Sequence, residues 1–174
     1  MFLRYILKKY LYIKLLLKYL LIPQIIIIKL KREMTEIQCS YIGNLKCDSI
    51  HINSGKRITT DVPLDHYGEG ENFSPTDLLA ASLGSCLITI MAIKARNKGW
   101  EIENIKLKIK KTMTDNSNRQ IKELFIEICL PIEYNKSQCR FLKEASEKCP
   151  VTKSLSKSLS IRIKWHSQFN VNDY

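Results

Sequence analysis

Residues 74–98 read SPTDLLAASLGSCLITIMAIKARNK, and this stretch decides the fold. Ser74 can cap the first backbone N–H groups of a helix, Pro75 suits its first position, and Asp77 favours the helix dipole. Gly99 follows and can adopt the left-handed conformation that ends many helices. Between these signals almost every side chain is small or apolar. The sequence therefore predicts one long helix, buried over most of its surface.

Two groups of strands flank this helix. Before it, residues 36–42, 46–52 and 57–62 have the composition of short strands separated by Asn- and Gly-containing turns. After it, residues 102–113 alternate apolar side chains with lysines, and residues 121–132 alternate again. The second group is therefore predicted to form a long hairpin.

Two helices and a final strand are predicted in the C-terminal part. Either Asn135 or Ser137 can start an amphipathic helix that runs to Glu147, and Cys149 opens a short helix through the following proline. Residues 159–165 alternate as a last strand. Because no β-α-β alternation is visible, we predict an α+β domain and no Rossmann-type sheet. With few helices to cover it, the long apolar helix is expected to pack against a second subunit as a homodimer.

Basic residues are concentrated at the N-terminus. The chain has 174 residues, 45% of them apolar, which is enough for one domain with a sizeable core. Of the formal net charge of +11, residues 1–33 supply +7, from eight basic residues and one acidic residue. The remaining residues show no run of basic and aromatic side chains typical of an RNA-binding surface. We therefore expect no nucleic-acid partner.

Residues 1–33 are apolar residues interspersed with lysines, and two interpretations are open for them. Lysines along one helix face could place the segment on an anionic membrane surface. Lys14, Lys18 and Pro23 interrupt the roughly 20 apolar residues that a spanning helix needs. We interpret residues 1–33 as an extension outside the fold, and residues 34–174 as the domain.

Six cysteines, at positions 39, 47, 86, 129, 139 and 149, show no C-x-x-C pair and no regular framework spacing. No cleavable signal peptide is apparent, so reduced thiols in the cytoplasm are expected. A free cysteine is usually a small buried apolar residue. For Cys39, Cys47 and Cys129 on strand patterns, and for Cys139 beside a helix start, that structural interpretation is sufficient.

Cys86 and Cys149 differ in their expected electrostatic setting. A reactive thiolate needs a nearby cation or a helix N-terminus. Cys149 is predicted at the N-cap of its short helix, whereas Cys86 lies about three turns inside the long helix, too far for the terminus to act. Local sequence therefore ranks Cys149 as the more acidic thiol. Cys86 would need a cation from another segment, and Lys46 and Arg57 on the N-terminal strands are the candidates.

The segment FSPTDLLAASLGSCL at residues 73–87, followed some sixty residues later by CPVTKSL at residues 149–155, resembles the OsmC/Ohr family of bacterial thiol-dependent peroxidases. The resemblance extends from about residue 34 to residue 165 in the same element order. It implies an OsmC-like fold: an N-terminal three-stranded sheet, a long central helix, a strand hairpin, two further helices and a last strand. It also implies two subunits interlocked as a homodimer, with both active sites at the interface.

By the same resemblance, Cys86 is the peroxidatic nucleophile. Cys149 resolves its sulfenic acid into a disulfide, which a dithiol then reduces. Lys46 is the closest match to the family's activating arginine, with Arg57 less well aligned, and either would hold Cys86 as a thiolate.

Two departures from the family pattern matter. Thr76 stands where the well-characterised peroxidases have a glutamate, and Asp77 beside it is the candidate catalytic carboxylate. In addition, a lysine cannot give the bidentate contact of an arginine. These departures place the chain nearest to the less characterised OsmC-like members.

We predict a thiol peroxidase that reduces organic hydroperoxides with a dithiol as co-substrate. Leu83, Leu87 and Ile90 are expected to form an apolar lining that favours alkyl peroxides. No cofactor or metal is expected, because the three histidines lack metal-ligand spacing. The cycle requires Cys86 and Cys149 to lie close together. The missing glutamate motivates an alternative from another class, a small-ligand-binding or thiol-sensing dimer without efficient turnover.

Overall fold

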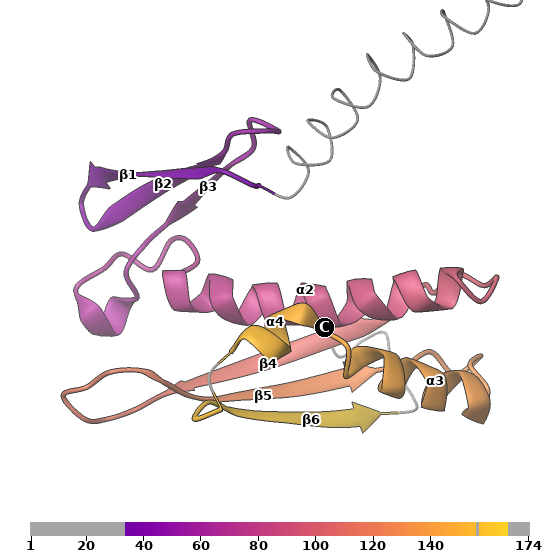
Figure 1. Cartoon of the computed structure of the whole chain (residues 1–174). Helices are drawn as coiled ribbons and strands as arrows, with labels where there is room; N and C mark the ends of the chain where they lie inside the picture. Colours follow the sequence, from indigo (N-terminus) through magenta and orange to yellow (C-terminus); the bar gives the residue numbers. More distant parts are fainter. Residues whose placement is uncertain (1–33, 156, 167–174) are drawn as a thin grey trace, which may run out of the picture. The chain divides into compact units, whose positions relative to one another are not determined.

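The computed structural model describes residues 34–155 and 157–166, which belong to two compact units (Figure 1). The first unit ends at Thr59 and the second begins at Thr60. The proposed extension, residues 1–33, lies outside the described residues. The chain has the predicted α+β class and the predicted order of elements.

The first unit contains a small sheet. Its strands β1 (Ile37–Gly43), β2 (Lys46–His51) and β3 (Arg57–Thr60) are neighbours in that order, and the last residue of β3 is also the first residue of the second unit. β1 and β2 are antiparallel, and the turn between them places Asn44 and Leu45 at positive φ, 50° and 60°. Two positive φ values in succession are typical of the turn that matches strand twist in a hairpin. The turn predicted at Gly43-Asn44 is therefore confirmed.

The second unit combines helices with a second three-stranded sheet. After a short 3-10 turn, η1 (Leu64–His66), it contains α2 (Pro75–Arg96), β4 (Lys106–Met113), β5 (Ile121–Cys129), α3 (Lys136–Ser146), α4 (Pro150–Ser154) and β6 (Ser160–His166). β4 and β5 form the predicted antiparallel hairpin, whereas β6 runs parallel to β5. β5, the helices α3 and α4, and β6 thus form a β-α-β crossover, in contrast to the prediction that no β-α-β unit is present. An ordinary crossover contains one continuous helix, which gives a single helical pattern in the sequence. Here the crossover is divided at Cys149-Pro150 into two short helices, so that pattern is absent.

Several element ends are set by local backbone chemistry. Asn104 has a φ of 55°, so the extended backbone of β4 begins only at Lys106 instead of residue 102. Pro131, which has no N–H to donate, follows the end of β5 at Cys129. Of the two starts considered for α3, Asn135 is the N-cap, and its side chain accepts a hydrogen bond from the Gln138 N–H at 2.9 Å.

The start of α2 is a capping box, as its sequence suggests. The Ser74 hydroxyl oxygen accepts the Asp77 N–H at 3.1 Å, and an Asp77 carboxylate oxygen accepts the Ser74 N–H at 2.9 Å. The helix ends at Arg96 with Asn97 as C-cap, and Gly99 has the predicted positive φ, 82°. The capping residues from which the two ends of α2 were predicted therefore do determine where the helix begins and ends.

The core of the second unit lies between its helices and its sheet. α2, α3 and α4 lie on one face of the β4–β5–β6 sheet (Figure 1). Although α2 is long and apolar enough by composition to span a membrane, its buried face belongs to this core. The buried apolar side chains come from α2, β5 and α3 and include Leu83, Leu87, Met91, Leu124, Ile126, Ile128 and Leu142.

Gly84 allows β4 to approach α2 closely. A Cβ atom added at Gly84 would lie 2.8 Å from the Ile109 Cδ1 and 3.0 Å from the Leu107 Cδ2. Glycine normally weakens a helix interior by roughly 1 kcal/mol relative to alanine. At Gly84, closer packing of the helix on the sheet offsets this loss of helix stability.

We predict that Gly84→Val lowers the free energy of unfolding by about 2 kcal/mol, because the branched side chain overpacks the contact with Leu107 and Ile109. Ser82→Val, at an exposed position of the same helix, is the matched control and should cost less than about 1 kcal/mol through helix propensity alone. Urea unfolding of both variants measures the difference. Equal losses in the two variants would contradict the close approach at Gly84.

Candidate active site

Two cysteines far apart in the sequence meet beside α2. Cys86 lies in the middle of α2, and Cys149 is the residue just before α4. The Cys149 sulfur donates a hydrogen bond to the Cys86 sulfur at 2.9 Å. The predicted proximity of this pair is confirmed, whereas their catalytic roles stay a prediction.

Local structure explains how Cys149 reaches α2. The Cys149 N–H donates to the Ser146 carbonyl at the end of α3, and the Cys149 carbonyl accepts the Lys153 N–H in α4. Pro150, at the first position of α4, needs no N–H partner. The turn between α3 and α4 therefore holds the cysteine in a fixed place against the central helix.

The two thiols differ in exposure. Cys149 is fully buried, with 0% of its surface exposed, and it belongs to the core. Cys86 is partly buried and packs at the edge of the same core. A reagent entering from solvent can therefore reach the Cys86 sulfur more directly than the Cys149 sulfur.

The two thiols also differ in acidity. Burial raises the pKa of the Cys86 thiol above its ordinary value, and the neighbouring Cys149 raises it further. Burial opposes ionisation of Cys149 as well, but hydrogen bonds from Cys86, from the Thr152 hydroxyl and from the N–H groups of Thr152 and Val151 outweigh it and lower its pKa. The first proton to leave the pair is therefore that of Cys149, in agreement with the ranking from local sequence.

Thr152 is a contributor to this site that the sequence analysis did not single out. Its hydroxyl oxygen is buried and, within the described part of the chain, has no hydrogen-bond partner. A Cys149 thiolate supplies the acceptor that this hydroxyl lacks. Its place in the CPVT sequence is the only signal that could have found it.

The three residues expected to line an apolar pocket occupy different positions. Leu83 and Leu87 are 0% and 1% exposed and are part of the core. Ile90 is partly buried and packs against that core. Of these three side chains, Ile90 is the one that solvent reaches beside the cysteines, and a lining role stays a prediction for all of them.

The two candidate activating cations, Lys46 and Arg57, belong to the first unit. Lys46 is the first residue of β2 and is partly buried. The Arg57 guanidinium donates to the Asp48 carboxylate across the small sheet, and the pair forms a salt bridge. Activation of Cys86 by either residue stays a prediction.

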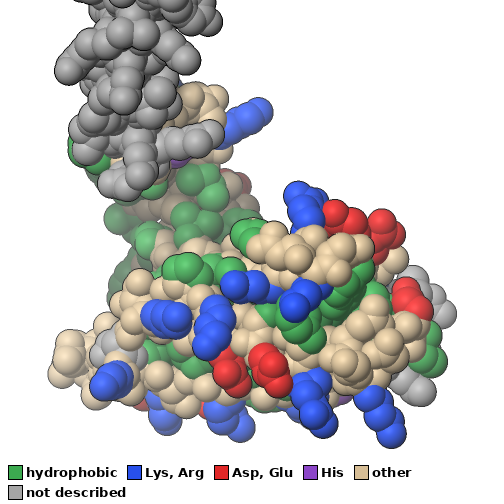
Figure 2. Space-filling model, turned by 45° about the vertical axis from the view of Figure 1, so that its right-hand side comes forward, with side chains coloured by type: hydrophobic (Ala, Val, Ile, Leu, Met, Phe, Trp, Pro, Cys, Tyr) green, Lys and Arg blue, Asp and Glu red, His purple; other side chains and the backbone are tan. Residues whose placement is uncertain are grey.

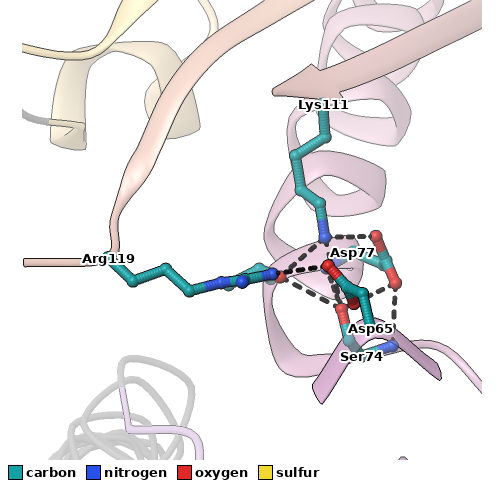
Figure 3. A network of polar contacts seen from close by, with 6 residues as sticks. Asp65, Ser74, Asp77, Lys111 and Arg119 are labelled. Carbon is teal, nitrogen blue, oxygen red and sulfur yellow. Dashed lines mark hydrogen bonds and ion pairs between the residues drawn. The ribbon is translucent and has the colours of Figure 1, made fainter. Parts of the chain in front are cut away.

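Asp77 takes part in a polar network at the start of α2 (Figure 3). The Lys111 ammonium, which β4 supplies, donates to an Asp77 carboxylate oxygen at 2.6 Å and to the Thr76 hydroxyl at 2.7 Å. It also contacts the Ser74 hydroxyl at 3.3 Å. Burial raises the pKa of Asp77, but the bonds from Lys111 and Ser74 outweigh it and lower this pKa below its ordinary value.

Lys111 therefore occupies the surroundings of Thr76, the position that distinguishes this chain from the well-characterised peroxidases. Its side chain is 16% exposed and follows the inward register of Leu107 and Ile109 along β4. That register was visible in the sequence, where Lys111 breaks the alternation of apolar and basic residues. A buried lysine was a recognisable signal that the sequence analysis missed.

Charged side chains elsewhere on the second unit are often paired. On the outer face of the sheet, Arg162 binds Glu123, and the Lys110 ammonium lies 3.9 Å from a Glu127 oxygen. Figure 2 shows Lys and Arg side chains interleaved with acidic and apolar ones over its visible face. In the described ranges, no three His, Cys, Asp or Glu side chains are grouped so as to hold a metal ion.

Residues 68–164 match the family model described as OsmC-like protein, which is more than half of the chain. The chain is 36% identical to a candidate osmotic-stress-induced and detoxification-response protein of Psychrobacter arcticus, whose crystal structure it matches with a TM-score of 0.71. The match covers 76% of this chain and 96% of that protein. The chain belongs to the OsmC family.

More distant OsmC-family structures share the fold. An organic hydroperoxide resistance protein OsmC of Legionella pneumophila is 14% identical with a TM-score of 0.62, and the match covers 76% of this chain and 96% of that one. The organic hydroperoxide resistance protein of Bacillus subtilis is 12% identical with a TM-score of 0.58, over 76% and 98% of the two chains. Among curated proteins, none matches this sequence. These comparisons confirm the predicted family and fold.

We predict that Lys111→Met lowers the free energy of unfolding by about 1 kcal/mol at pH 7, because it removes a largely buried ammonium from its acceptors. Asp77 has a folded-state pKa below its ordinary value of 3.8. Its pairing with Lys111 is therefore fully present above that value and is lost as the pH falls through the folded-state pKa. The difference between wild type and variant should shrink accordingly between pH 5 and pH 2.

Lys110→Met is the matched control, because Lys110 lies on the same strand with its side chain 61% exposed. This variant should change stability by less than about 0.5 kcal/mol. Denaturation at several pH values measures both variants. A Lys111→Met effect that is independent of pH would contradict the role given to the ion pair.

Proposed function

We propose that this OsmC-family protein is a cysteine-based thiol peroxidase that reduces organic hydroperoxides through Cys86 and Cys149. The observation that carries the proposal is the 2.9 Å contact between the two sulfurs, which brings together residues 63 positions apart. Such a pair can convert a sulfenic acid into a disulfide with little movement of the backbone. The names of two structural neighbours, organic hydroperoxide resistance proteins, support the same substrate class.

The proposed cycle begins at Cys86, because this is the sulfur that solvent reaches. Its thiolate attacks the terminal peroxide oxygen, the O–O bond breaks, and the alkoxide leaves as an alcohol after taking a proton. Cys149 then attacks the sulfur of the Cys86 sulfenic acid and releases water. A dithiol co-substrate reduces the resulting disulfide and is itself oxidised to a disulfide.

Ionisation of Cys86 needs help in this proposal. Within the second unit, burial and the neighbouring Cys149 raise the pKa of the Cys86 thiol. We propose that Lys46, or Arg57, from the same or a partner subunit supplies the missing positive charge. A nearby cation favours the thiolate and lowers the pKa of a cysteine toward the range of reactive thiols.

A homodimer is part of the same proposal. Ala81, Ser85, Thr89 and Ile93 follow one another at helical spacing on an exposed face of α2. In the first unit, Ile37, Tyr41 and Ile42 are each more than half exposed. Ala81 and Ile93 on this face of α2, together with the exposed apolar side chains of the first unit, favour association, and a second copy of the chain is the simplest partner. We place this dimer in the cytoplasm, where thiols stay reduced.

The cysteine assignment predicts distinct defects for the two variants. Cys86→Ser should lose more than a hundredfold of the dithiol-dependent consumption of cumene hydroperoxide, because no sulfenic acid can form. Cys149→Ser should still consume one equivalent and leave a sulfenic acid on Cys86 that dimedone traps. Cys139→Ser is the matched control, since Cys139 is a partly buried cysteine in α3. Equal activity of Cys86→Ser and wild type would refute the proposed function.

The activating cation can be tested separately. Lys46→Met should slow sulfenic-acid formation on Cys86 at pH 7 by about tenfold and move the pH profile of that rate to higher pH. Arg57→Met tests the second candidate, and Lys56→Met, at an exposed position before β3, is the control. Unchanged rates in both the Lys46 and the Arg57 variants would exclude these two residues as activators.

A second candidate function is a dimer that binds a small thiol-reactive ligand without efficient turnover. Two observations favour it: the pKa of Cys86 is raised, and Thr76, bonded to Lys111, replaces the family glutamate. The rate of sulfenic-acid formation separates the two functions. Formation no faster than that of a free cysteine, together with stoichiometric ligand binding, would favour the binding function.

A further inference from the structure

A reductant can attack the Cys86–Cys149 disulfide at either of its two sulfurs. The incoming thiolate bonds to one sulfur, and the other sulfur leaves as a thiolate. The proposed function needs this step but does not say which sulfur is attacked. The surroundings of the two cysteines differ in two independent respects, and both favour attack on the same sulfur.

The first respect is access. A thiolate must approach the attacked sulfur along the line of the S–S bond, from the side opposite the leaving sulfur. Cys149 is 0% exposed and is enclosed in the core, so such an approach would require the core to open. Cys86 is partly exposed. Access therefore favours attack on Cys86.

The second respect is the stabilisation of the leaving group. Thr152 is the third residue of α4, so its backbone N–H lies on the side of the N-cap residue Cys149, and its hydroxyl is buried without a partner among the described residues. Cys86 sits in the interior of α2, where the backbone N–H groups of the helix already donate to carbonyls one turn back, so its backbone donor is the Val151 N–H of α4, whereas the N–H groups of both Thr152 and Val151 favour the Cys149 thiolate. A negative charge is therefore better accommodated on the Cys149 sulfur. The lowered pKa of Cys149 agrees with this difference.

We propose that the reductant attacks the Cys86 sulfur, that Cys149 is the leaving thiolate, and that Thr152 is the hydrogen-bond donor that stabilises it. The first thiolate forms a mixed disulfide with Cys86 as the Cys86–Cys149 bond breaks. The second thiol of the reductant, after losing its proton, attacks its own sulfur in that mixed disulfide and releases Cys86. Two electrons pass from the dithiol to the protein, and its two protons end on the two cysteines.

The attacked sulfur can be identified by trapping. Diamide oxidises the full chain to the Cys86–Cys149 disulfide without any hydroperoxide, so failure of the proposed peroxidase function would leave this experiment readable. Glutathione in excess is then added, and the reaction is stopped in acid and alkylated in urea. Peptide mapping should find glutathione on Cys86 and the alkyl group on Cys149, in a ratio above about ten to one. Equal labelling, or glutathione mainly on Cys149, would overturn the proposal.

The role of Thr152 is tested by two variants of similar shape. Thr152→Val should slow reduction of the preformed disulfide about tenfold, because a hydrogen bond to a charged leaving group is lost. It should also raise the pKa of Cys149, measured in the Cys86→Ser background. Thr152→Ser, which keeps the hydroxyl, should stay within about twofold of wild type.

Ser154→Ala is the control for the loss of any hydroxyl in α4, since the Ser154 hydroxyl donates to the Pro150 carbonyl instead. It should reduce at the wild-type rate. Formation of the disulfide by diamide in every variant verifies that the site is assembled. Wild-type reduction rates and an unchanged Cys149 pKa in Thr152→Val would show that Thr152 is not the donor.

Discussion

Close packing of α2 against the β4–β5–β6 sheet is the constraint on which the second unit depends. Leu83, Leu87 and Met91 are almost completely buried on one side of the helix, and Gly84 admits the side chains of β4 beside them. Because side chains repeat every 3.6 residues, this buried face fixes the rotation of the whole helix. Cys86 is thereby held at the edge of the core, where its sulfur contacts the sulfur of Cys149 from the turn between α3 and α4.

The chemistry of the site follows from an asymmetry between two thiols in contact. The buried sulfur of Cys149 is the better place for a negative charge, and the more exposed sulfur of Cys86 is the better place for attack. In a two-cysteine cycle these properties are complementary. The accessible sulfur meets the peroxide and the reductant in turn, while the stabilised sulfur closes the disulfide and later leaves it. Because the pKa of Cys86 is raised, the proposed cycle needs a cation from outside the immediate surroundings of this thiol.

Features encoded by neighbouring residues were predictable from the sequence. The capping residues of α2 and the turn at Gly43-Asn44 depend on interactions within a few positions of the chain. The lowered pKa of Cys149 depends in part on its neighbours Val151 and Thr152 and in part on the distant Cys86. The contact between Cys86 and Cys149 has no such local signal, and only the resemblance to the OsmC/Ohr family indicated it. Lys111 was overlooked because the lysines around it suggested an exposed strand face, although its register points inward. The parallel crossover between β5 and β6 was not predicted, because the sequence between these strands shows two short helices instead of one continuous helical pattern.

The family assignment fixes the fold and narrows the chemistry, yet the residues around the thiols carry the functional argument. At the start of α2, Thr76 stands in place of the family glutamate, and the Lys111 ammonium joins its hydroxyl to the Asp77 carboxylate. The most direct test is to treat the reduced full chain with one equivalent of cumene hydroperoxide and to measure intact mass and linked peptides. We predict the loss of two hydrogen atoms and a single Cys86–Cys149 linkage. An unchanged mass, or a linkage between other cysteines, would contradict the central claim.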